Sequence, residues 1–163
     1  MLPENIYLSE NSEEQRRQIT NFYRDIASEI NGYYSEFIPT LYGSTTAGTL
    51  TYTSAVGFYH RQNLMVDLFL DINFSALGGA VGDISIDLPF KSKQLSTTPW
   101  MAPIYQSGLS FSANYTSAFL VLEQNSTTAT IFETGSGQTA QALTFAVSGT
   151  GSLKCNIRYI GQV

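Results

Sequence analysis

The sequence predicts a mainly β protein, an antiparallel β-sandwich of jelly-roll type preceded by one amphipathic α-helix. The chain of 163 residues holds 35 Ser and Thr, 13 Gly and 20 Phe and Tyr. Such a composition is typical of short strands joined by polar turns. Apolar and polar residues alternate in several segments beyond residue 63, which indicates strands with one buried face. Only a segment near the start has the spacing of a helix.

Residues 12–30 carry the helical pattern. Ser12 and Gln15 have the spacing of a capping box, and Glu13 and Glu14 would lie at the positive end of the helix dipole. An isolated helix of this length is marginal in water, so its apolar stripe must be covered. Either identical helices form a short parallel bundle, or the helix packs on its own sheet. The stripe consists of Ile19, Phe22, Tyr23, Ile26 and Ile30.

A break in composition follows this helix. Residues 1–36 hold seven of the thirteen acidic and three of the eight basic residues, while the rest of the chain is nearly neutral. Asn31-Gly32 provides a helix stop. We therefore predict an N-terminal arm and helix over residues 1–32, used for attachment or oligomerisation, and a β-sandwich domain over residues 33–163.

Alternating side chains predict the strands of this domain. The clearest strand covers residues 64–74, and residues 83–88 form a second. Residues 91–99 are predicted as a polar loop. Gly-, Ser- and Asn-rich turns separate the later strands, which gives about eight to ten strands in total. These later strands lie near residues 109–111, 120–122, 130–132, 143–147 and 153–159.

The composition argues against several classes of function. A net charge of −5 with eight Lys and Arg disfavours binding to nucleic acid. No apolar run reaches the ~20 residues of a membrane-spanning helix, and the first residues lack the order of a secretory signal. A single His60 and a single Cys155 exclude multi-histidine and multi-cysteine zinc sites. We expect no cofactor, no metal and no membrane partner.

The residues capable of catalysis do not form a recognisable set. No G-x-S-x-G motif supplies a serine nucleophile for His60 to activate, and Cys155 lies on the apolar face of the last strand. Four aspartates could share one solvent face if their two strands formed a hairpin: Asp67, Asp71, Asp83 and Asp87. There they could hold a cation or act as the acid pair of a glycosidase. The simpler interpretation is the polar face of alternating strands, so we expect no catalytic residues and no enzyme.

Aromatic residues outside the clean alternation are the remaining candidates for binding. Trp100, Tyr105 and Tyr115 are the candidate ligand-facing residues, because Trp and Tyr in loops can stack on sugar rings. Pro99 and Pro103 would hold Trp100 rigidly. The interpretation that we favour is that these aromatics, with Tyr33, Tyr34 and Tyr42, cap the ends of the sandwich or fill a subunit interface.

Residues 37–90 resemble a pattern of bacteriophage fibre and head- or tail-appendage proteins. An aromatic-x-Pro-x-Leu-x-Gly opening is followed by Gly-x-x-x-Tyr, by Gly-x-Tyr-x-Arg and by Asn before an apolar strand; Leu-Pro-Phe comes later. The family usually has Gly before that Asn, where this chain has Gln62, so the turn is expected to be one residue shorter. The matching positions are Phe37, Pro39, Leu41, Gly43, Gly48, Tyr52, Gly57, Tyr59, Arg61, Asn63, Leu88, Pro89 and Phe90.

This resemblance implies a virion structural protein with a trimeric jelly-roll domain: a tail fibre, a head fibre or a capsid decoration subunit. The implied partners are two further copies in a homotrimer, other virion proteins of the capsid, tail or baseplate, and a host surface glycan where the domain serves host attachment. A lectin-like carbohydrate-binding module without a structural role is the alternative function.

Overall fold

The computed structural model describes residues 12–31, 33–95, 97–145 and 149–162. In this part of the chain one helix, α1 (Ser12–Asn31), precedes ten strands. The predicted fold class is therefore confirmed as mainly β with one N-terminal helix. The strands are β1 (Tyr33–Phe37), β2 (Leu41–Gly43), β3 (Thr51–Gln62), β4 (Met65–Ala76), β5 (Ile84–Asp87), β6 (Trp100–Ser107), β7 (Ser117–Leu122), β8 (Thr128–Thr134), β9 (Gln141–Ala142) and β10 (Gly151–Ile160).

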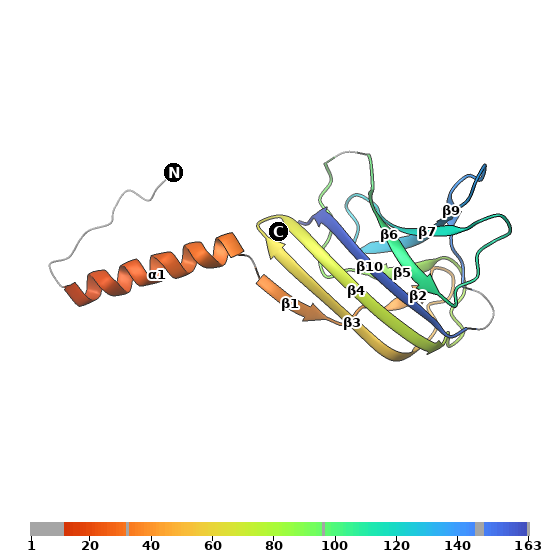
Figure 1. Cartoon of the computed structure of the whole chain (residues 1–163), viewed down its shortest axis with the longest axis horizontal. Helices are drawn as coiled ribbons and strands as arrows, with labels where there is room; N and C mark the ends of the chain where they lie inside the picture. Colours follow the sequence, from red (N-terminus) through yellow and green to blue (C-terminus); the bar gives the residue numbers. More distant parts are fainter. Residues whose placement is uncertain (1–11, 32, 96, 146–148, 163) are drawn as a thin grey trace.

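The strands form an antiparallel sheet that curls into two layers. Their order is β1-β3-β4-β10-β6-β7-β8-β5-β2, and β9 pairs with β8. The change of layer takes place within β6, because residues 100–103 pair with β7 and residues 104–107 pair with β10. Figure 1 shows β3, β4 and β10 side by side as long strands, and α1 standing off one end of the sandwich. No helix in the described residues is long and apolar enough to cross a membrane.

The core lies between the two layers, as alternation predicts for sheets with one buried face. Each inward side chain of β4 is at most 3% exposed: Val66, Leu68, Leu70, Ile72 and Phe74. They belong to one cluster with inward residues of the other layer and of β10, among them Ile84, Ile86, Leu120, Leu122, Ile131, Leu153 and Ile157.

Two of the predicted strand positions are wrong. The strand near residues 109–111 is absent, and β6 instead covers residues 100–107. Proline normally argues against a strand because it lacks an N–H donor. Here Pro103 is the last residue of β6 that pairs with β7, so the missing donor falls where the strand changes partner. The strand predicted near residues 143–147 is replaced, in its described part, by a single bridge from Thr144 to Asp83 just after β9, while residues 146–148 lie outside the described residues.

The turn between β3 and β4 has two residues, since Gln62 pairs with Met65. Asn63 takes a φ of 55° there, in the left-handed region that Asn tolerates better than most residues.

Candidate functional site

The predicted oligomerisation stripe of α1 lies partly within the described side chains. In the single chain Ile19 is 47%, Phe22 38% and Tyr23 67% exposed. The rings of Phe22 and Tyr23 meet edge-on with centroids 6.1 Å apart. Of the strands, β3 is the one that α1 touches appreciably. The backbones of Ile26 and Ile30 belong to the helix, whereas their side chains lie outside the described residues. The described side chains of the stripe are therefore exposed to solvent in the single chain.

The three candidate ligand-facing aromatics do not form one platform. Trp100 and Tyr105 lie in β6 rather than in a loop, five positions apart, so they point to opposite faces of the strand. Trp100 is partly buried against the core, and its ring meets that of Tyr159 at 6.4 Å. Tyr115 donates its hydroxyl to the Thr139 carbonyl at 2.8 Å. Tyr105 is the most exposed of the three, at 63%.

The four aspartates are not on a shared face. β4 pairs with β3 and β10, while β5 pairs with β2 and β8, so the hairpin needed to bring the carboxylates together is absent. Asp87 instead accepts a hydrogen bond of 2.9 Å from the Tyr42 hydroxyl. Among the described residues no group of three His, Cys, Asp or Glu is placed to hold a metal ion.

A surface that the sequence did not single out lies on the outer face of β3, β4, β10 and β6. Its middle is apolar: Val56, Phe58 and Phe69 are each 40–46% exposed, and Phe58 is the direct partner of Phe69 across the two strands. A shallow groove of about 390 Å³ runs from these side chains to Pro103 of β6. We call Val56, Phe58, Phe69 and Pro103 the apolar band.

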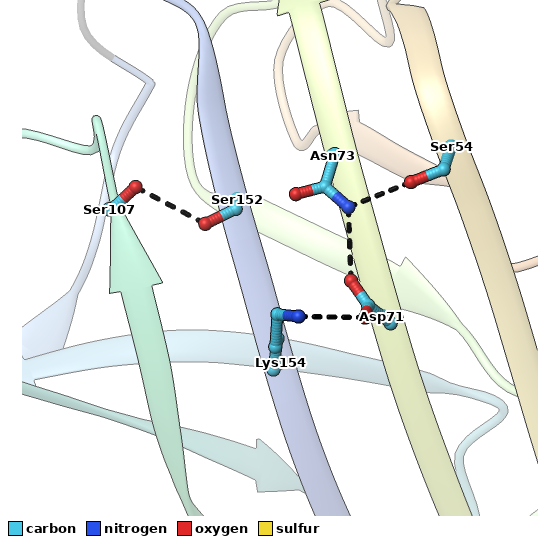
Figure 2. Close-up of polar contacts among 6 residues, drawn as sticks. All are labelled: Ser54, Asp71, Asn73, Ser107, Ser152 and Lys154. Carbon is cyan, nitrogen blue, oxygen red and sulfur yellow. Dashed lines mark hydrogen bonds and ion pairs between the residues drawn. The ribbon is translucent and has the colours of Figure 1, made fainter.

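Polar side chains border the apolar band at one end. Figure 2 shows this row crossing four strands, from Ser54 on β3 through Asn73 on β4 to Ser152 and Ser107. The amide of Asn73 donates to Ser54 at 2.7 Å and to Asp71 at 3.0 Å. An apolar centre with a hydrogen-bonded polar edge is the usual anatomy of a protein–protein interface.

Two ion pairs join β4 to β10 on the same face. Lys154 donates to Asp71 at 2.9 Å, and Arg158 binds Asp67 through two nitrogens. The hydrogen bond and the charge of Asp71 raise the pKa of Lys154, and those of Asp67 raise the pKa of Arg158. Each of the two β4 carboxylates therefore has a cation beside it, and these four charges sum to zero. Glu36 of β1, the register partner of Phe58, is exposed beside them.

The thiol of Cys155 lies beneath the same groove and is buried. Burial raises its pKa to about 12. The nucleophilic thiolate is consequently scarce near neutral pH. Cys155 behaves as a small apolar side chain of β10.

The residues that carry the family resemblance have structural contacts. The Arg61 guanidinium lies 4.7 Å from the centre of the Phe90 ring, and Tyr59 meets the same ring edge-on at 4.9 Å. The Tyr159 hydroxyl donates to the Phe90 carbonyl at 3.1 Å. A Cβ on Gly57 would overlap the Phe37 ring, so glycine is needed at this close approach. The motif joins β1, β3, β10 and the segment after β5 into one packed end of the sandwich.

Sequence reasoning missed the apolar band although one signal was present. Phe69 stands in the polar register of its strand, between Asp67 and Asp71. A large aromatic at such a position is either a surface exception or part of an interface. Only the pairing of β3 with β4 shows that Phe58 lies directly opposite Phe69.

Comparison with known proteins gives a likeness of fold. No protein-family model matches the sequence, and no curated protein matches it. The chain is similar in structure to part of the Dettilon tailspike protein, with a TM-score of 0.58 and 21% sequence identity. The match covers 77% of this chain and 23% of that chain. At this identity the likeness concerns the fold.

Proposed function

We propose that the chain is a structural subunit of a bacteriophage virion, a homotrimeric appendage or decoration protein that associates through α1 and projects the β-sandwich. The observation that carries this proposal is the apolar stripe of α1, which stays exposed in the single chain. The likeness to part of a tailspike protein and the motif of residues 37–90 support the choice of a virion protein.

The energetics favour association through the stripe. Burying a large apolar side chain contributes about 1.5–3 kcal/mol relative to leaving it exposed. Ile19, Phe22 and Tyr23 lie on one side of the helix, and each would contribute in every copy of a bundle. A helix that stands off its own domain gains this contribution only from other copies or from a docking partner.

The proposed role is mechanical. The arm of residues 1–32 would dock on another virion protein of the capsid, tail or baseplate, and the sandwich would project outward, where its loops can serve host attachment. We propose no catalytic step: Asp67 and Asp71 each have a basic partner, and Asp83 and Asp87 lie in the other layer. Release of reducing ends from a host polysaccharide by the purified protein would contradict this part of the proposal.

Native mass by light scattering tests the proposed trimer. The full chain is expected at three times its mass of 17.9 kDa. Ile19→Glu places a charge in the stripe and is expected to shift the trimer toward monomer. Asn21→Glu is the matched control, because it adds the same charge at an exposed residue on the side of the helix away from the stripe.

The outcomes separate clearly. A trimer that is dissociated by Ile19→Glu and retained in Asn21→Glu supports association through α1. A monomer at every concentration tested would overturn the homotrimer. A trimer that both variants leave intact would remove α1 from its interface.

A further inference from the structure

The apolar band is a candidate interaction surface, because its exposed apolar side chains gather on one face and line one groove, whereas singly scattered ones need no explanation. Its members come from the β3–β4 hairpin and from β6, which is distant in the sequence, and the register places them together: Phe58 lies opposite Phe69, and Phe69 lies opposite Asn156 on β10. Across β10, Pro103 completes the groove. All four side chains of the band are exposed in the single chain.

The charges beside the apolar band favour a second copy of the chain as its occupant. The net charge of −5 is concentrated in residues 1–36, whereas residues 37–163 carry a net charge of −1, so general charge repulsion between sandwich domains is weak. On this face Asp67 and Asp71 are neutralised within the face by Arg158 and Lys154. Two copies can therefore bring the outer faces of β4 and β10 together without an excess of like charge there, while Glu36 of β1, opposite Phe58, lies at the edge of the contact.

The position of α1 also favours other copies of the chain as the partner of the apolar band. The helix is followed directly by β1, it touches β3, and β3 carries Val56 and Phe58. Helices bundled around a symmetry axis hold the strands that follow them near that axis. Residues near the axis meet their own equivalents in the other copies, an arrangement that apolar side chains tolerate and unpaired like charges do not.

We propose that the outer face of β3, β4, β10 and β6 is a second self-association surface, on which the apolar band of one copy packs against the other copies of the chain. This inference rests on the homotrimer proposed above and extends its interface from the helix onto the sandwich. The polar row of Figure 2 and the ion pairs form the rim of the contact.

Phe69→Lys in the full chain tests this surface. The Phe69 side chain is 46% exposed and lies outside the core, so the domain should keep its fold, which circular dichroism checks. Three lysines brought together in the trimer would repel, and we expect the concentration at which the trimer dissociates to rise at least about tenfold. Val81→Lys is the matched control, since Val81 is 53% exposed and lies in the segment between β4 and β5.

Comparison with Ile19→Glu distinguishes the failure of this inference from the failure of the proposed trimer. Dissociation by Phe69→Lys but not by Val81→Lys supports the second surface, whatever the helix variant does. A trimer that is lost in Ile19→Glu and unchanged in Phe69→Lys overturns the second surface and keeps the helix; this outcome includes a band covered by the chain's own helix or by another protein. A monomeric unmodified chain overturns both proposals.

Discussion

The two faces of β4 differ in a way that separates folding from assembly. Its inward residues are uniformly apolar and almost completely buried. Its outward residues mix two ion-paired aspartates, a hydrogen-bonded asparagine and the half-exposed Phe69. The inner face is completed by the chain itself, whereas the outer face keeps apolar surface in water. We infer that substitutions on the inner face change the stability of the domain, while those on the outer face change its association.

The largest effect is expected on the inner face. Leu68 has no exposed surface, and Leu68→Ala should lower the free energy of unfolding by about 2–5 kcal/mol through lost transfer energy and a residual cavity. Urea denaturation measures this loss. Met65→Ala, on the outer face of the same strand, is the control. Equal losses in the two variants would remove the distinction between the faces.

Trp100→Ala is expected to have an intermediate effect on the free energy of unfolding. Its side chain is partly buried against the core and contacts the Tyr159 ring. Trp100→Ala should therefore cost about 2 kcal/mol, less than a fully buried aromatic, as measured by thermal or urea unfolding. Under the lectin alternative, the same variant would lose binding in a glycan screen while keeping the stability of the domain. Tyr105→Ala, at the exposed end of β6, should leave stability nearly unchanged.

Glu133 is a charged residue on the inner face of β8, and its substitution tests how much a buried, hydrogen-bonded carboxylate contributes to stability. This carboxylate is 1% exposed on β8 and accepts hydrogen bonds from the Ser112 N–H at 2.9 Å and the Gln141 amide at 2.7 Å. Burial by itself would raise its pKa, but these hydrogen bonds to Gln141 and Ser112 outweigh burial, and the pKa is lowered.

A lowered pKa in the folded state means that this stabilisation is fully present above the ordinary pKa of a glutamate and is lost as the pH falls through the lowered value. Glu133→Gln should remove that part of the pH dependence and cost about 1 kcal/mol at neutral pH. Unfolding followed from pH 7 downward measures both effects, with the exposed Glu123→Gln as the control. A variant whose acid unfolding matched that of the natural chain would exclude the role given to Glu133.

The smallest effect is expected at the outer ion pairs. Arg158 and its bond to Asp67 are solvent-exposed, and such pairs contribute little to stability. Arg158→Gln should leave the unfolding midpoint of the domain unchanged within error, while it makes the outer face acidic and weakens the trimer. Light scattering at increasing salt concentration would detect the weaker trimer, because salt screens the charge of the Asp67 carboxylate that Arg158 no longer neutralises. A large fall in unfolding stability would mean that the outer face also maintains the fold.

Much of the fold could be predicted from local pattern. The helix stripe, the alternation in β4 and β10 and the polar turns each depend on neighbours a few residues apart, which a sequence displays directly. The path of β6 could not be predicted, because Pro103 argues against a strand unless its change of partner is known. The possible grouping of the four aspartates on one face also failed. It required β4 to pair with β5, and the strand order of the fold does not bring these two strands together.

By itself, the sequence determined the fold class, the amphipathic helix and the inward faces of β4 and β10, because side-chain periodicity follows from local backbone geometry. Tertiary structure alone decided what the outward residues do. It placed Phe58 opposite Phe69, brought Pro103 across β10 to the same groove, and paired Asp67 and Asp71 with cations more than eighty residues away. These contacts depend on strand order and register, which are set by burial of the whole core and not by any one segment of the chain.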